Sequence, residues 1–176
     1  VQAARLYRNE IAIAAYPKSP PDIELADYYT EHIVLCLAGS LLAQCRIDLD
    51  AHRDEIAAGD LSSLRGCPFV LGSAADIGGR IGRELLCSSG ILPVSKATSE
   101  NVETLLALCV QGVGACFCPE NLLQTALSPE QLTQLHILPL CPDASYPICF
   151  GYLKRSYPWS VLSEFIQIAR EQIESA

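Results

Sequence analysis

Few basic residues, few aromatic side chains and no methionine set the first limits on this chain. Its 176 residues include 12 lysines and arginines against 20 aspartates and glutamates, for a formal net charge of -8. A surface with this charge repels a phosphate backbone, so the chain by itself is not expected to hold DNA. The first residues, "VQAARLYRN", resemble the second half of a helix. Together with the missing methionine, they predict that the chain begins inside a longer protein.

Long apolar runs are also missing. No stretch approaches the roughly 18 consecutive apolar residues that a membrane span needs, and the first residues do not have the pattern of a signal peptide. Half of the residues are nonetheless hydrophobic, which is enough to build a sizeable core. We therefore expect a soluble protein with no membrane partner.

Histidine is scarce, which bears on metal binding. His32, His52 and His136 stand alone in the sequence, whereas nine cysteines lie mostly inside apolar runs. An odd number of cysteines in apolar surroundings indicates reduced thiols and hence the cytoplasm. Cys116 and Cys118 point to one face of a predicted strand, but a zinc site would need further ligands. We predict that the cysteines pack as small apolar side chains, with no metal and no cofactor.

The order of apolar runs predicts an α/β fold. "CPFVLG" is typical of a buried strand, and "DIGGRIGRELLCSSG" follows with helical spacing and a closing glycine. The unit repeats as the strand "LPVSKA", a helix capped by Thr98 or Ser99 and ended by Gly112, and the strand "VGACFC". This alternation indicates a parallel sheet. Further elements are expected as strands at 23–29, 32–37, "LHILPL" and "YPICFGYLK", a helix starting at Pro119 and a closing amphipathic helix from Trp159.

Several ordered segments resemble the effector-binding domain of LysR-type transcriptional regulators. The best match is "SENVETLLALCVQGVGACFCPENLL", a helix that leads into Gly-x-Gly and a strand ending in proline. It is supported by "LYRNEIAIAAYP", "HIVLCLAGSLLAQ", "LSSLRGCPFVLG", "LHILPL" and "KRSYPWSVLSEFIQIARE", so the resemblance covers essentially the whole chain. The chain departs from the family at Ala12, where an acidic residue is usual, and at Leu41 and Leu42, where His-Pro is usual.

The resemblance implies a two-lobed α/β fold like that of type 2 periplasmic binding proteins. Lobe I would comprise residues 1–35 and 145–176 and would be incomplete here, and lobe II would comprise 36–144. The winged helix-turn-helix of the family is absent from this chain, so DNA would be bound only through that missing N-terminal domain. The family also implies self-association as a dimer or tetramer.

A ligand site is expected in the cleft between the lobes. In open α/β sheets, ligands bind beyond the carboxyl ends of strands, and backbone N–H groups at helix starts favour anions such as carboxylates. Strand exits, a glycine that lets backbone approach a ligand and an aromatic wall make up the candidate ligand-binding residues: Tyr16, Gly72, Ser73, Thr98, Ser99, Gly114 and Phe150.

The resulting functional prediction is the small-molecule-sensing part of a LysR-type regulator, without enzymatic activity. One alternative is a stand-alone solute-binding protein of the same fold, although nine thiols fit poorly with an oxidising compartment. A thiol-based redox sensor is a second alternative, with Cys87 near the end of the helix that follows the first lobe II strand. An enzyme on a related fold is a third, but the sequence contains no recognisable catalytic set.

Overall fold

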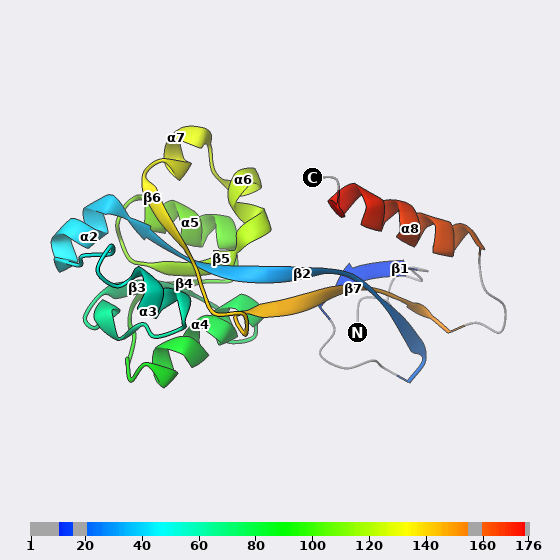
Figure 1. The fold of residues 1–176 in the computed structure, drawn as a ribbon, viewed down its shortest axis with the longest axis horizontal. Helices are drawn as coiled ribbons and strands as arrows, with labels where there is room; N and C mark the ends of the chain where they lie inside the picture. Colours follow the sequence, from blue (N-terminus) through cyan, green and yellow to red (C-terminus); the bar gives the residue numbers. More distant parts are fainter. Residues whose placement is uncertain (1–10, 16–20, 155–159, 175–176) are drawn as a thin grey trace. The chain divides into compact units, whose positions relative to one another are not determined.

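The structure is a computed structural model that describes residues 11–15, 21–154 and 160–174 (Figure 1). It divides into two compact units, unit 1 with Val1–Glu31 and Ser145–Ala176, and unit 2 with His32–Ala144. That these units are the two lobes of a binding protein stays a prediction. The helix expected over the first nine residues lies outside the described residues. No described helix combines the length and apolarity needed to cross a membrane.

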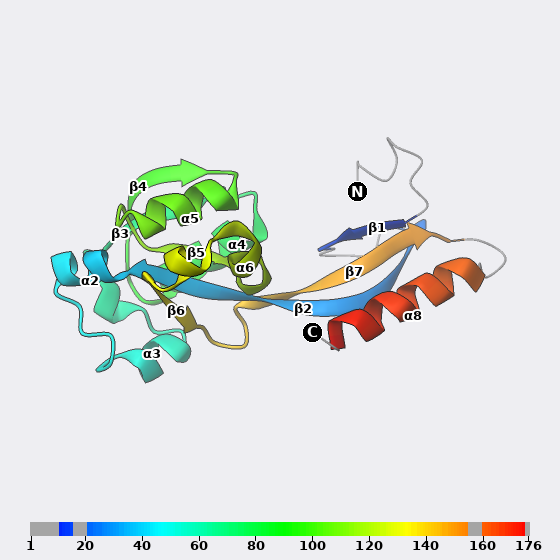
Figure 2. The same ribbon diagram turned by 90° about the horizontal axis from the view of Figure 1, so that it is seen from above.

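Unit 1 is a small antiparallel sheet with one helix against it. Its elements are β1 (Ile11–Ala14), the first part of β2 (Ile23–Ala38), β7 (Ser145–Leu153) and α8 (Ser160–Glu174). In the sheet order, β7 lies between β1 and β2, and Ile13 pairs with Phe150. Figure 2 shows α8 running beside β2 and β7, and Arg170 Nε donates to the backbone oxygen of Asp27 at 2.7 Å. A side-chain hydrogen bond to the sheet therefore holds α8 in addition to its apolar packing.

The expected amphipathic face of α8 is only partly covered. Ile166 is buried, whereas Phe165 and Ile173 keep 48% and 38% of their surface exposed. The helix exists as predicted, because its apolar residues recur at helical spacing.

Unit 2 is built on a mixed sheet. It contains the second part of β2 together with β3 (Pro68–Gly72), β4 (Val94–Ser99), β5 (Cys116–Pro119) and β6 (Leu135–Pro139). β3 pairs with β4 in parallel, and a parallel bridge between Phe69 and Ala115 joins β3 to the residue before β5. β5 and β6 both pair with β2, each antiparallel to it. The strand order is therefore β4-β3-β5-β2-β6, and β2 runs opposite to the other four.

Two sequence predictions about strands need correction. The sheet is not wholly parallel, because β2 enters it from unit 1 and no helix connects it to a neighbour in the manner of a β-α-β crossover. The two strands expected at 23–29 and 32–37 form the single strand β2. Thr30 and Glu31 stand between them, and neither is a glycine or proline that would break an extended segment.

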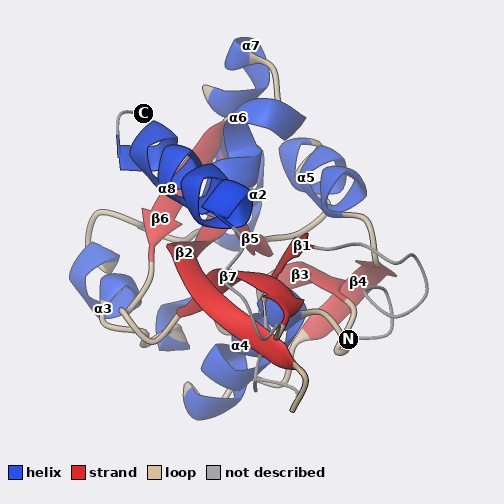
Figure 3. Cartoon of the chain, turned by 90° about the vertical axis from the view of Figure 1, so that its right-hand side faces the viewer, coloured by secondary structure: helices blue, strands red, loops and turns tan. Residues whose placement is uncertain are grey.

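Helices cover both faces of this sheet. α4 (Ile77–Ser88) connects β3 to β4, and α5 (Val102–Val110) connects β4 back to β5. Because right-handed crossovers in opposite directions along a sheet put their helices on opposite faces, α4 and α5 lie on either side of it (Figure 3). Gly90 and Gly112 stand just after the ends of α4 and α5, and both have the positive φ that favours glycine at a helix end, as the sequence predicted.

The remaining helices of unit 2 are short. They are α2 (Gly39–Cys45), α3 (Arg53–Ala57), α6 (Leu123–Ala126), α7 (Pro129–Leu132) and the single 3₁₀ turns Ser62–Leu64 and Glu120–Leu122. The prediction that a helix starts at Pro119 is therefore wrong about the first residue of that helix. Pro119 is the last residue of β5, and the chain makes a 3₁₀ turn before α6 begins.

The core of unit 2 lies between the sheet and these helices. Phe69 is fully buried, and its ring is parallel to that of Phe117 with 6.0 Å between centroids. Other fully buried side chains come from both the sheet and the helices: Leu35, Leu37, Leu41, Ile56, Leu61, Leu64, Leu86 and Leu106.

Candidate functional site

A polar pocket lies at the carboxyl ends of β3 and β4. The two strands are parallel and in register at their ends, with Leu71 opposite Thr98 and Gly72 opposite Ser99. The residues at and just after the ends of both strands therefore meet at one edge of the sheet. They line a cavity of about 320 Å³ together with one residue of α4: Ser73, Ala74, Arg83, Thr98, Ser99 and Glu100. All of these residues belong to unit 2.

The loop after β3 is held by short local contacts. Ser73 Oγ accepts a hydrogen bond from the Ala75 N–H at 3.2 Å, and Asp76 caps α4 by accepting from the Gly79 N–H at 3.0 Å. A Cβ on Gly79 would lie 2.3 Å from the Ser73 oxygen, so backbone packs directly on backbone here. This contact fixes where Ser73 stands at the pocket.

The predicted cap of α5 is wrong by two to three residues. Asn101 is the cap, and its Oδ1 accepts from the Thr104 N–H at 3.0 Å. Thr98 and Ser99 belong to β4, because the parallel pairing with β3 continues as far as Gly72 and Ser99. Ser99 Oγ accepts from the Asn101 N–H at 3.0 Å and so supports the turn before the helix. Thr98 is exposed and Ser99 is half-buried at the pocket.

Arg83 is the pocket residue that sequence reasoning missed. Its Nη2 donates to the Gly72 backbone oxygen at 3.0 Å, whereas its Nη1 is buried and has no hydrogen-bond partner in the described part of the chain. Arg83 lies one turn after Gly79, and helical side chains lean toward the helix start. Gly79, one turn earlier, is a local signal of close packing at the helix start, but no local pattern specifies the contact of Arg83 with Gly72.

The structure brings together three of the predicted site residues, Ser73, Thr98 and Ser99, at this pocket. Gly72 is buried under the loop, where a Cβ would lie 3.3 Å from Gly79. Tyr16 lies outside the described residues. Ligand contact by any of these residues stays a prediction.

Gly114 and Phe150 have different surroundings from those expected. A Cβ on Gly114 would lie 2.8 Å from the Phe69 carbonyl carbon, so its close backbone approach is to β3 rather than to open space. Phe150 is fully buried in unit 1, with ring centroids 4.5 Å from Tyr28 and 6.0 Å from Phe165. Both residues have packing roles that account for their size, and ligand contact by either stays a prediction.

Four cysteines of unit 2 form a buried cluster. Cys36, Cys109, Cys116 and Cys118 all have 0% exposure, and the sulfurs of Cys36 and Cys118 lie 3.6 Å apart. Hydrogen bonds from the Cys116 and Cys36 thiols lower the pKa of Cys118 to about 5, whereas thiol hydrogen bonds and burial raise that of Cys116. Among the described residues, no group of three or more His, Cys, Asp or Glu side chains could hold a metal ion. The cluster packs inside the core, as the sequence predicted for Cys116 and Cys118.

Burial should govern the reactivity of these thiols more than pKa does. With an aromatic disulfide reagent under native conditions, we expect Cys87, the one exposed cysteine, to react first. The four clustered thiols should react only after unfolding, and Cys87→Ser should remove the fast phase. Rapid native modification of Cys118 in the Cys87→Ser variant would contradict this account and would favour thiol sensing.

The two α/β units and the pocket at the ends of parallel strands define a class, the periplasmic-binding-protein-like α/β domains. The sequence profile of the LysR substrate binding domain matches residues 2–174, so the chain belongs to this family, the effector-binding domains of LysR-type transcriptional regulators. This confirms the family and fold class that the sequence predicted.

Solved structures share the fold of the chain at low sequence identity. The effector binding domain of QuiR in complex with shikimate has a TM-score of 0.65 and 16% identity over 97% of this chain and 75% of that chain. The BenM effector binding domain with its effector benzoate has a TM-score of 0.69 and 18% identity, over 99% of this chain and 73% of that chain. The CcmR regulatory domain of Synechocystis PCC6803 in complex with 2-PG has a TM-score of 0.70 and 10% identity, over 97% of this chain and 76% of that chain.

Full-length regulators match as well, over a smaller share of their length. The chain covers 54% of full-length BenM, with a TM-score of 0.68 and 19% identity over 99% of this chain. It therefore spans about half of a whole regulator and three quarters of an isolated effector-binding domain. No curated protein matches the sequence.

Proposed function

We propose that this chain is the ligand-sensing domain of a LysR-type transcription regulator and that it binds a small effector at the pocket of unit 2. The observation that carries the proposal is the convergence of Ser73, Thr98 and Ser99 at the carboxyl ends of two parallel strands. Three hydroxyl groups at this edge offer several hydrogen bonds to one small molecule. The pocket's volume of about 320 Å³ falls in the range of small-ligand sites.

We infer that the effector carries a carboxylate. Hydroxyl groups donate well to carboxylate oxygens, and the ligands named for two of the similar structures, shikimate and benzoate, are both carboxylates. The chain would act by binding rather than by turnover. Its nine free cysteines suit a reducing cytoplasm.

Binding would regulate transcription by favouring one arrangement of the regulator over another. The shift in that equilibrium cannot exceed the difference in effector affinity between the two arrangements. DNA contact would come from an N-terminal domain outside this chain, and self-association as a dimer or tetramer would pass the change between copies.

Removing pocket hydroxyls tests the proposal. We expect Ser73→Ala combined with Thr98→Ala to weaken effector binding about tenfold or more, because each neutral hydrogen bond contributes about 1 kcal/mol. A thermal-shift screen of small carboxylates, including shikimate and benzoate, would supply the ligand, and calorimetry would give its affinity. Ser95→Ala, on the same strand but outside the pocket, is the control.

The proposal fails if the strongest ligand binds the double variant as tightly as it binds the unchanged chain. It also fails if no small molecule in a broad library stabilises the folded chain.

A further inference from the structure

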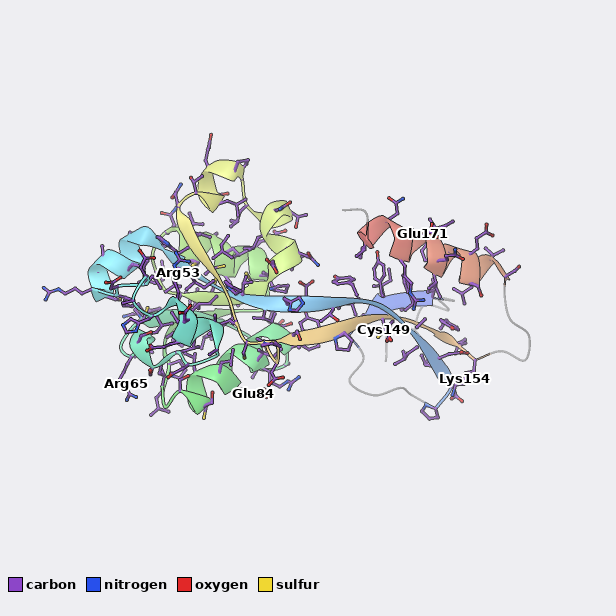
Figure 4. All side chains as sticks on the ribbon, viewed as in Figure 1. Arg53, Arg65, Glu84, Cys149, Lys154 and Glu171 are labelled. Carbon is purple, nitrogen blue, oxygen red and sulfur yellow. The ribbon has the colours of Figure 1, made fainter. Side chains whose placement is uncertain are left out.

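The pocket contains one positive and one negative side chain that do not form an ion pair with each other. In the part of the chain that the structure describes, neither Arg83 nor Glu100 forms an ion pair, although both line the cavity. By contrast, Arg80 on the same helix pairs with Glu84 at 3.2 Å on the exposed side of α4, where Figure 4 labels Glu84. The charges of Arg83 and Glu100 are therefore available to a ligand.

The guanidinium of Arg83 is also oriented before any ligand arrives. Its Nη2 is anchored to the Gly72 oxygen, and a planar guanidinium held at one nitrogen has little freedom to turn. Nη1 is a buried charged donor without a described partner, which is a costly state for the folded protein. Nη1 is covered by its neighbours, so an anion in the pocket would respond first to the positive charge of the guanidinium as a whole, which favours anions over neutral molecules.

The remaining lining residues are small and offer hydrogen bonds as well as apolar contacts. They comprise the hydroxyl side chains of Ser73, Thr98 and Ser99 and the methyl group of Ala74, with no aromatic or large aliphatic side chain. Small-molecule sites are usually lined mostly by apolar and aromatic side chains. A plain aromatic or aliphatic acid has no donor for the exposed Glu100 carboxylate and would use none of its capacity to accept hydrogen bonds.

We propose that the effector is a small carboxylate that also carries a hydrogen-bond donor, either a hydroxyl or an ammonium group. Arg83 binds the carboxylate, and Glu100 accepts from the donor. This inference rests on the proposed function and names the ligand class of the same site. The hydroxyls of Ser73 and Thr98 complete the polar contacts around the ligand.

Matched probes test the ligand class on the 176-residue chain. Shikimate carries a carboxylate and hydroxyls, its methyl ester lacks the charge, and cyclohexanecarboxylate lacks the donors. 1-Aminocyclohexanecarboxylate replaces the hydroxyls by an ammonium group. Ligand-observed NMR and calorimetry should find binding of shikimate, of the amino acid or of both. The ester and the plain acid should bind about tenfold more weakly or not at all.

Charge-removing variants assign the two side chains. Arg83→Gln should lower affinity for the best probe about 10- to 100-fold and erase the preference for the acid over its ester. Arg83→Lys keeps the charge and so separates loss of charge from misfolding. It should retain part of the preference for the acid over its ester. Arg80→Gln is the control, and should change affinity less than about threefold because it removes only an exposed ion pair.

Glu100→Gln should reduce about tenfold the difference in affinity between donor-bearing acids and the plain acid. If the natural donor is an ammonium group, the loss should be larger for the amino acid probe than for shikimate. Glu103→Gln, which removes a carboxylate that does not line this pocket, is its control. The inference is overturned if plain acids bind best, if no donor-bearing carboxylate binds, or if Arg83→Gln and Arg80→Gln behave alike. A ligand that depends on Ser73 and Thr98 but not on Arg83 or Glu100 would overturn it while leaving the proposed function standing.

Discussion

Replacing Gly79 by alanine is expected to lower the free energy of unfolding by about 3 kcal/mol. The added Cβ would lie 2.3 Å from the Ser73 oxygen and 2.9 Å from the Gly72 carbonyl carbon. Both are backbone atoms, so relief requires moving the end of β3 or the start of α4. The same movement would displace Ser73 from the pocket, so we also expect weaker effector binding.

Chemical denaturation followed by circular dichroism would measure the effect of Gly79→Ala. Gly39→Ala is the matched control, because its Cβ would meet nothing closer than His136 Nε2 at 3.7 Å. Alanine there, at the first residue of α2, should change stability by less than about 1 kcal/mol. Equal effects of the two substitutions would show that the contact between Gly79 and Ser73 is not tight.

Phe69→Ala is expected to have the largest effect on stability, a loss of about 4 kcal/mol. Phe69 is fully buried in β3 and stacks on Phe117, so alanine would leave a cavity under the strand that leads to the pocket. The backbone of Phe69 also bridges to Ala115, which ties the cavity to the junction of β3 and β5.

Phe165→Ala is the matched control for Phe69→Ala. Phe165 keeps 48% of its surface exposed on α8, although its ring contacts Phe150 edge to face. The same truncation should therefore cost only about 1 kcal/mol. A larger loss for Phe165 than for Phe69, measured by denaturant titration, would contradict the assignment of the unit 2 core.

Much of unit 2 could be predicted because its local signals agree with the final packing. Of the five apolar residues expected on one face of α5, Leu105, Leu106, Cys109 and Val110 are buried and Val102 is half-buried. Gly112 follows the helix with a positive φ. Helix periodicity and glycine at a helix end depend on neighbours in the sequence, which is why they can be predicted from it.

Features that depend on distant residues were harder to predict. The cap of α5 falls on Asn101 because β4 is held in pairing with β3 as far as Ser99, and no local pattern specifies how far a pairing extends. β2 is one strand because both parts find partners in the sheet order, although its middle is polar.

The pocket illustrates the same limit at the level of function. Ser73, Thr98 and Ser99 were predictable because they lie at or just after the ends of strands, and parallel strands bring their ends together. Arg83 was not, because its place depends on the contact between its Nη2 and the Gly72 oxygen eleven residues earlier. A helical arginine looks like a surface residue until the start of the helix is known to pack on the strand exit.

The most direct test of the account is to map the bound effector on the chain by NMR. The ligand that most stabilises the protein would be titrated while the backbone amide shifts are followed. We expect the largest changes at Ser73 and Ala75 after β3, at Ser99 at the end of β4 and at Asn101 beyond it, saturating with the affinity measured by calorimetry. Saturable changes confined to other parts of the chain, with these amides unmoved, would contradict the claim that this pocket binds the effector.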